Sequence, residues 1–194
     1  MIYLFQLLLL MGTPVPSHTI VFPGFQLTIH DFEVLPGGNK QDGDTTWIQE
    51  EIGMQLDGKR ISLAGKQGDV FEVVLTRDIV FRISTHERMW QDAEAMSYTE
   101  ELPLNFISGH SVLPVFSRTE ARNNHRVPLD DLVEELKSWT WDDPAYEPEW
   151  DMVKSFDDVP GEFFVKETRI QIIHRTKAGD SHTYWMINKG TYGC

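Results

Sequence analysis

The stretch T-R-I-Q-I-I-H-R-T-K-A-G-D-S-H-T-Y-W-M-I-N, residues 168–188, decides the fold class. Apolar and polar residues alternate along much of it, and a period of two is typical of a half-buried β-strand. Residues 177–180 include a glycine and an aspartate, which favour a tight turn between two strands. The stretch therefore predicts an antiparallel β-hairpin.

The register of this hairpin determines where its two histidines lie. If Ala178 and Gly179 form a two-residue turn, His174 faces Thr183, and strand alternation sends His174 and His182 to opposite sides of the hairpin. The core-like face then holds Ile170, Ile172, His174, Thr183, Trp185 and Ile187, and the other face holds Arg175, His182 and Tyr184. We therefore expect His174 to be a hydrogen-bonded histidine beside the core rather than a catalyst. A three-residue loop would reverse this conclusion, because it would bring the two imidazoles to the same side.

Residues 19–84 have the pattern of short strands separated by turns. Asp57 and Gly58 stand between the runs M-Q-L and R-I-S-L, and Asp-Gly is a strong hairpin signal because both central residues must accept positive φ. A second hairpin is predicted where residues 70–75 and 79–84 flank Thr-Arg-Asp. This half predicts a meander or a small barrel-like sheet.

Three short helices are predicted in the middle of the chain. Residues 84–87 have the Ser-x-x-Glu form of a capping box, and residues 117–120 repeat it. Pro128 opens the third helix, since proline suits the first helical position. The apolar faces consist of Met89, Ala93 and Met96 in the first helix and of Leu129, Leu132, Val133, Leu136 and Trp139 in the third. Between these helices, residues 104–107 and 112–116 are predicted strands.

Together these elements predict a single α+β domain, mainly antiparallel β-sheet with about three short central helices and a C-terminal β-hairpin. The length of 194 residues and the 41% of hydrophobic residues suit one globular core and exclude disorder. The expected parts are a strand-rich region, a mixed helix and strand region, an acidic aromatic loop and C-terminal strands: residues 1–84, 85–139, 140–160 and 161–194.

Cysteine usage and the most apolar run bear on location. The single cysteine, Cys194, excludes an intramolecular disulfide and zinc sites built on paired thiolates, and it favours a reducing, cytoplasmic setting. Residues 2–11, I-Y-L-F-Q-L-L-L-L-M, lack the preceding basic residues of a secretory leader and are about half as long as a membrane-spanning helix. We expect a buried strand or core helix there and no membrane span. An unusual leader and an arm docking on a neighbouring subunit are the alternatives.

Acidic residues are concentrated in one part of the chain. Residues 130–162 hold 12 acidic residues against Lys137 and Lys154, and so carry −10 of the formal net charge of −13. Aromatic residues are interleaved with them in the run W-T-W-D-D-P-A-Y-E-P-E-W-D-M-V-K-S-F-D-D-V-P-G-E-F-F. Aromatic side chains are effective binding anchors, and carboxylates around them would select a basic partner. A solvated acidic surface whose aromatic side chains belong to the core is the alternative interpretation.

The function expected from this segment is that of a non-enzymatic binding protein that engages a basic partner protein, as an inhibitor or as a nucleic-acid-mimicking decoy. The negative charge argues against direct binding of nucleic acid, and no cofactor is expected. The predicted binding residues are Trp139, Trp141, Asp142, Asp143, Tyr146, Glu147, Glu149, Trp150, Asp151, Asp157 and Asp158. The alternatives are a structural subunit of a virion or large complex, docking through an uncharged N-terminal arm, and a small histidine-dependent hydrolase or transferase.

Familiar catalytic motifs are absent from the sequence. It has no glycine-rich phosphate loop, no His-Glu-x-x-His and no Gly-x-Ser-x-Gly. The candidates for a histidine site are His86, His110, His174 and His182. A weaker alternative for the acidic run is calcium bound by Asp142, Asp143, Glu147, Glu149 or Asp151. Arg118, Arg122 and Arg126 recur at a spacing of four and would either bind an anion or phosphate or balance the acidic helix that follows them.

Overall fold

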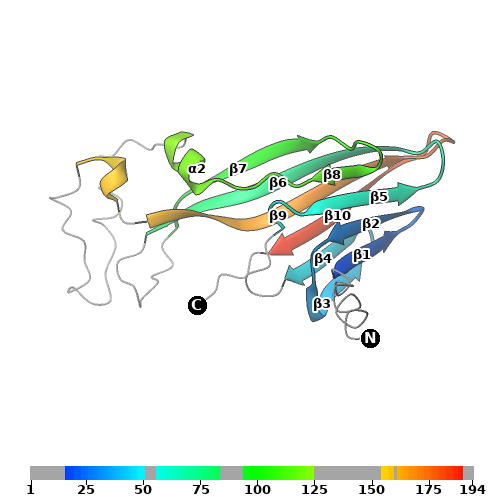
Figure 1. The fold of residues 1–194 in the computed structure, drawn as a ribbon, viewed down its shortest axis with the longest axis horizontal. Coiled ribbons are helices and arrows are strands. Elements are labelled where there is room, and N and C mark those ends of the chain that lie inside the picture. The colour runs from blue at the N-terminus through cyan, green and yellow to red at the C-terminus, as the bar shows by residue number, and fades with distance from the viewer. Residues whose placement is uncertain (1–15, 51–55, 84–93, 125–153, 160, 190–194) are drawn as a thin grey trace, which may run out of the picture.

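The computed structural model describes residues 16–50, 56–83, 94–124, 154–159 and 161–189, which form two β-sheets with little helix (Figure 1). One sheet has four strands and the other has six. The inner faces of both sheets contribute to one hydrophobic core. This arrangement leaves each sheet with one face turned away from the core.

The four-stranded sheet has the order β1-β2-β5-β8, and each neighbouring pair is antiparallel. Its strands are β1 (Ser17–Phe22), β2 (Phe25–His30), β5 (Arg60–Gly65) and β8 (His110–Val112). In β2, apolar and polar residues alternate, so one face of the strand is buried and the other is more exposed to solvent. Phe25, Leu27 and Ile29 form the buried face.

The six-stranded sheet has the order β3-β4-β10-β9-β6-β7. Its strands are β3 (Val34–Asp42), β4 (Thr45–Glu50), β10 (Ser181–Lys189), β9 (Gly161–Arg175), β6 (Val70–Ile83) and β7 (Glu94–Leu104). All neighbouring pairs are antiparallel except β4 and β10, which run parallel. The central strands β9 and β6 are therefore paired on both edges. Their β-branched and aromatic residues favour the strand conformation.

The core between the sheets is built from alternating residues of both. The four-stranded sheet contributes Ile20, Phe22, Phe25, Leu27, Ile29 and Ile61, and the six-stranded sheet contributes Ile48, Val73, Leu75, Ile170, Ile172, Tyr184 and Met186. Each fully buried side chain of this size contributes about 1.5 to 3 kcal/mol. Burial of these two faces against each other is the main reason that the sheets stay together.

The long strands β6 and β9 extend past the four-stranded sheet to a second, smaller apolar cluster (Figure 1). There Phe81 packs against Phe156 and Phe163, with ring centroids 5.2 and 5.0 Å away. Two short elements lie at this end, the α-helix α2 (Arg118–Asn124) and the 3-10 helix η3 (Phe156–Asp158). This end of the molecule is where the acidic segment enters and leaves the described chain.

The predicted α+β class is wrong, because the described residues are mostly strand. α2 is the one α-helix within the described ranges. In the predicted first helix, Met96 lies in β7 opposite Phe81 of β6. Cross-strand pairing with β6 outweighs the local helical spacing there, since propensity yields to tertiary contacts. The rest of that prediction, residues 84–93, lies outside the described residues.

The other two predicted helices have different outcomes. The helix after residues 117–120 is confirmed, and the Ser117 hydroxyl accepts a hydrogen bond from the Glu120 amide at 3.2 Å. The predicted helix that begins at Pro128 lies outside the described residues. The strands predicted at residues 104–107 and 112–116 differ from those observed, because β7 ends at Leu104 and β8 spans His110–Val112. A two-residue turn at Ser108 and Gly109 leads into β8.

The hairpin predicted around Thr-Arg-Asp is wrong, because β6 continues through these residues as one strand. The reason is that Arg77, which resembles a turn residue in the sequence, is only 1% exposed and is paired with acids from distant parts of the chain. A register irregularity between Asp78 and Ile79 marks the place where the strand bends toward the second cluster.

The hairpin predicted at Asp57 and Gly58 is also wrong. Gly58 does have a positive φ of 72°, as a turn requires. However, β5 pairs with β2 on one edge and with β8 on the other. These described strands leave neither edge of β5 for a hairpin partner formed by the residues that precede Asp57. Asp57 binds Arg77 and the Phe116 amide instead.

The C-terminal hairpin is confirmed, but its predicted register is wrong by one residue. The loop has three residues, 177–179, closed by a hydrogen bond from the Thr176 amide to the Asp180 carbonyl at 2.9 Å. Gly179 adopts a φ of 97°, the left-handed conformation that such a loop requires. His182 therefore faces His174 directly, and Tyr184 and Met186 replace Thr183, Trp185 and Ile187 on the core face.

Among the described residues, no helix combines the length and the apolar character that a membrane crossing demands.

Candidate functional site

The candidate site of the sequence analysis is only partly within the described residues. Its first nine residues, Trp139, Trp141, Asp142, Asp143, Tyr146, Glu147, Glu149, Trp150 and Asp151, lie outside them, as do the calcium candidates. The structure describes Asp157 and Asp158 and the residues around them. The geometry of the acidic segment is therefore known at its C-terminal end.

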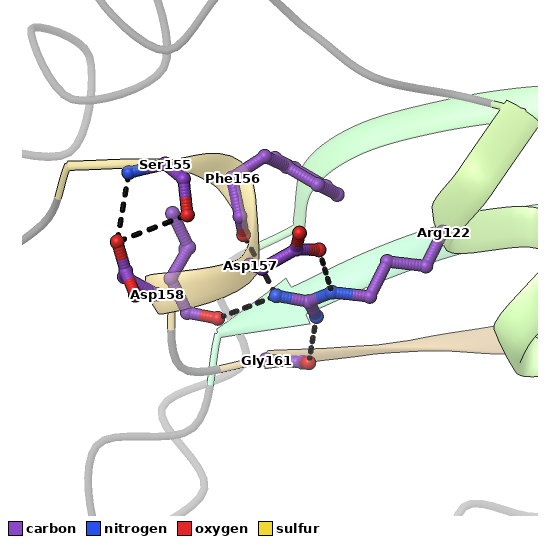
Figure 2. A network of polar contacts seen from close by, with 7 residues as sticks. Arg122, Ser155, Phe156, Asp157, Asp158 and Gly161 are labelled. Atoms are coloured by element: carbon purple, nitrogen blue, oxygen red, sulfur yellow. Dashed lines mark hydrogen bonds and ion pairs between the residues drawn. The ribbon is translucent and has the colours of Figure 1, made fainter.

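Asp158 is engaged by its own loop. One of its carboxylate oxygens, Oδ2, accepts hydrogen bonds from the Ser155 amide at 2.8 Å and the Ser155 hydroxyl at 2.9 Å (Figure 2). The same oxygen accepts a hydrogen bond from the Lys154 amide at 3.0 Å. These hydrogen bonds, that from the Lys154 amide first, hold the pKa of Asp158 below its usual value. The carboxylate stabilises the turn of η3, so the structure favours a local role for it over partner contact.

Asp157 lies beside Arg122, which is the centre of a network that joins α2 to η3 (Figure 2). Nε of Arg122 lies 3.3 Å from Asp157, and its Nη atoms donate to the carbonyls of Phe156 at 2.7 Å and Gly161 at 2.9 Å. A weaker bond reaches the Val159 carbonyl at 3.2 Å. A guanidinium group presents its donors in a fixed planar arrangement. Here these donors bind the backbone carbonyls of the short loop at η3, an arrangement that we call the Arg122 clamp.

The aromatic residues at this end of the segment pack against the protein. Phe156 is 6% exposed and Phe163 is 1% exposed, and both contact Phe81. The Arg122 guanidinium lies 5.0 Å from the Phe156 ring centroid. These aromatic rings belong to the second apolar cluster, so here the alternative interpretation of the segment, with aromatics in the core, is the correct one.

The two described arginines of the group spaced by four pair with acids of this chain that follow the expected acidic helix; that helix itself lies outside the described residues. Arg118 pairs with Glu162, both of them exposed, and stacks over Phe164 at 4.9 Å. Arg122 pairs with Asp157. Arg126 lies outside the described residues. The two described arginines are therefore occupied by the end of the acidic segment rather than by an external anion.

The candidate histidines that the structure describes do not form one group, although His174 and His182 face each other on β9 and β10. His110 lies in β8 of the four-stranded sheet, whereas His174 and His182 lie in β9 and β10 of the other sheet, and His86 is outside the described residues. Within the described ranges, no group of three His, Cys, Asp or Glu side chains is placed to hold a metal ion.

His174 is a hydrogen-bonded histidine beside the core, although the two-residue register from which this was expected is wrong. It is 2% exposed, its Nε2 lies 2.9 Å from Oδ2 of Asp69, and its ring stacks on Phe71 at 4.9 Å. This hydrogen bond is the largest cause that holds the pKa of Asp69 below its ordinary value. Asp69 lies in the turn between β5 and β6, so the pair fixes the connection between the two sheets.

Sequence reasoning missed one polar cluster, formed by His30, Ser62 and His110 on three neighbouring strands of the four-stranded sheet. Nε2 of His30 lies 2.9 Å from the Ser62 hydroxyl, and the ring centroids of His30 and His110 are 6.3 Å apart. The sequence carries no local signal for this cluster, because the three residues meet only through the register of β2, β5 and β8.

Comparisons with protein-family models, with curated proteins and with solved structures find no match to this chain.

Proposed function

We propose that the chain is a non-enzymatic binding protein whose acidic, aromatic-rich segment engages a basic partner protein. The contact residues are those from Trp139 to Asp151, because Asp157 and Asp158 are engaged within the chain. Between Asp130 and Asp151 the sequence has nine acidic residues and one basic residue. A partner whose nucleic-acid site is basic would meet carboxylates where phosphates would lie, and the protein would then act as an inhibitor or decoy.

The observation that carries this proposal is the clamp at Arg122. Arg122 belongs to α2, which precedes residues 125–153, and it binds η3, which follows them (Figure 2). The segment therefore leaves the described chain and returns to it at one end of the long strands. Anchoring both ends of a segment at one place lowers the entropy that it loses on binding.

The electrostatics around the clamp support the same proposal. Arg118 and Arg122 are paired with Glu162 and Asp157, so neither described arginine of α2 is left to neutralise the rest of the segment. The net negative charge that residues 130–151 carry in the sequence would attract a basic surface over about one Debye length, which is roughly 8 Å at physiological salt. This attraction would raise the association rate more than the final affinity.

The test compares two variants with the same change in net charge. In the first, Asp142, Asp143, Glu147 and Glu149 are replaced with lysine. In the second, the matched control, Glu33, Asp42, Asp44 and Glu101, which are exposed elsewhere, are replaced with lysine. Binding of fluorescent poly-L-lysine is measured by anisotropy at several salt concentrations.

The proposal expects the first variant to lose about tenfold or more in affinity, the control to lose much less, and wild-type binding to weaken steeply with salt. Equal losses in the two variants would show that net charge, and not this segment, attracts the probe. Circular dichroism of both variants checks that the sheets remain folded. Affinity capture from the native source with wild-type and first-variant protein then identifies the partner.

A further inference from the structure

The outer face of the four-stranded sheet differs in charge from the rest of this acidic protein. Strand alternation and register direct three cross-strand rows of side chains away from the core. The rows are Ser17, His30, Arg60 and Val112; Thr19, Thr28, Ser62 and His110; and Val21, Gln26 and Ala64. The four strands place no carboxylate among these outward side chains, although the chain carries a formal net charge of −13.

The outer face of the six-stranded sheet provides the contrast. There Arg175 pairs with Glu72 at 2.7 Å, and Arg169 pairs with Asp78 at 2.7 Å. In the part of the chain that the structure describes, Arg60 forms no ion pair with a carboxylate. Among the described residues, no carboxylate occupies the hydrogen-bond donors of Arg60.

Three groups with donor capacity gather around Ser62. His30 lies within hydrogen-bond distance of the Ser62 hydroxyl, His110 is the direct neighbour of Ser62 on β8, and Arg60 is two residues away on the same face of β5. The rings of His30 and His110 are 6.3 Å apart. The Thr28 hydroxyl is the neighbour of Ser62 on the opposite strand. One small ligand centred on Ser62 is thus within reach of all of these groups.

The charges that act on His30 favour an anion at this place. Partial burial, then Arg60 on β5 and His110 on β8, lower the pKa of His30, whereas Asp31 at the end of β2 opposes them; the residue opposite on β1 is the uncharged Ser17. An anion bound between Arg60 and the imidazoles would remove this repulsion and favour protonated His30. By linkage, protonation must then strengthen binding of the anion.

We propose that Arg60, His30, His110 and Ser62 form a binding site for a tetrahedral oxyanion, the phosphate or sulfate group of a small molecule. Arg60 supplies a guanidinium fork, which suits phosphate and sulfate oxygens. In the neutral tautomer that leaves Nε2 without a proton, His30 accepts a hydrogen bond from the Ser62 hydroxyl. Protonated His30 donates to Ser62 instead, and the Ser62 hydroxyl is then free to donate to the anion. The site gains a donor and a charge as the pH falls, and it is independent of the acidic segment.

A transition metal is the competing ligand for two neighbouring imidazoles. Metal binding requires neutral imidazole, so it would strengthen as the pH rises. Arg60 beside His30 disfavours a cation at the same place. The opposite pH dependences of the two ligands make the distinction measurable.

The experiment follows the histidine Cε1 proton resonances of the full chain by NMR during titration with inorganic phosphate or with sulfate. Sodium chloride keeps the ionic strength constant, and the titrations are run at about pH 6 and pH 8. Glucose 6-phosphate and N-acetylglucosamine 6-sulfate are added in parallel to distinguish the two sources of the oxyanion. The His30→Gln and His110→Gln variants assign the resonances.

We expect saturable shifts of the His30 and His110 resonances in the millimolar range, stronger at about pH 6 than at pH 8, with no comparable shift of His182. The Arg60→Gln variant should weaken binding about fivefold or more and keep the wild-type circular dichroism spectrum. Shifts that also occur with chloride alone, that persist unchanged in Arg60→Gln, or that appear with zinc chloride and not with phosphate or sulfate would overturn the proposal.

Discussion

Asp57 and Arg77 form an ion pair that connects the two sheets, with Nη2 of Arg77 lying 2.8 Å from Oδ1 of Asp57. The Arg77 side chain is 2% exposed in the middle of β6, and Asp57 precedes β5. The other carboxylate oxygen of Asp57 accepts a hydrogen bond from the Phe116 amide at 2.8 Å. Glu100 and the Pro114 carbonyl complete the surroundings of the guanidinium. One buried cation thus joins β6, β7 and the segments that flank β5 and β8.

Replacing Asp57 with alanine should lower the free energy of unfolding by about 3 kcal/mol, the lower end for loss of one partner of a buried pair, because Glu100 remains beside Arg77. Urea denaturation measures the change. The matched control is Glu72→Ala, which removes a carboxylate from the exposed pair with Arg175 and should cost less than about 1 kcal/mol. Similar losses in the two variants would contradict the central role of the buried pair.

Acid stability should depend on Asp69. The hydrogen bond from His174 holds the pKa of Asp69 below the ordinary value of 3.8, so the unfolded chain binds this proton more readily than the folded protein. The stability that the carboxylate contributes is present above the ordinary pKa and is lost as the pH falls through the lower folded value. Asp69→Asn should therefore be less stable at neutral pH and lose less stability below about pH 4. Urea midpoints measured against pH test this, and an unchanged acid limb would argue against it.

Stability near neutral pH should depend on His18 and His30. Burial is the largest cause that lowers the pKa of each below the ordinary value of 6.5. The unfolded chain therefore gains protons at a higher pH than the folded protein, and the free energy of unfolding falls as the pH drops through about 6.5. The double variant with glutamine at both positions should show a shallower fall between about pH 8 and pH 5. A slope equal to that of the wild type would be evidence against the shifts.

Loosening the Arg122 clamp should increase hydrogen exchange in η3. Arg122→Lys keeps the charge but loses the fork that reaches the Phe156 and Gly161 carbonyls. We expect the amides of residues 155–159 to exchange at least about tenfold faster, as measured by mass spectrometry. Arg118→Lys is the control, because Arg118 and Glu162 are both exposed and that pair contributes little. Equal acceleration in both variants would exclude a specific clamp.

The hairpin at residues 168–188 shows how far local sequence determines the fold. The alternation of apolar and polar residues predicted two strands, and Gly179 predicted a turn between them; the strands and the turn are present. The register depended on whether Lys177 belonged to the loop, and alternation alone does not decide this, because one residue more in the loop reverses the faces of one strand. Gly179 at a φ of 97° selects the three-residue loop.

Arg77 shows why the rest of the fold was not predictable. Thr-Arg-Asp has the composition of a turn, and the Arg77 side chain is buried because Asp57 reaches it from the turn before β5 and Glu100 reaches it from β7. The same holds for His30 and Ser62, which meet through strand register alone. In the acidic segment, composition could not separate Phe156, which packs into the second cluster, from aromatic residues available to a partner.

The parallel neighbours β4 and β10 place Trp47 opposite Ile187. During synthesis, β3 and β4 leave the ribosome long before β10 is made. The edge of β4 that pairs with β10 stays unpaired until then. Sheets closed by such distant partners form slowly, because the intervening chain must be brought together first. A nascent chain stalled ahead of β10 would present an unpaired edge to chaperones rather than a finished half-domain.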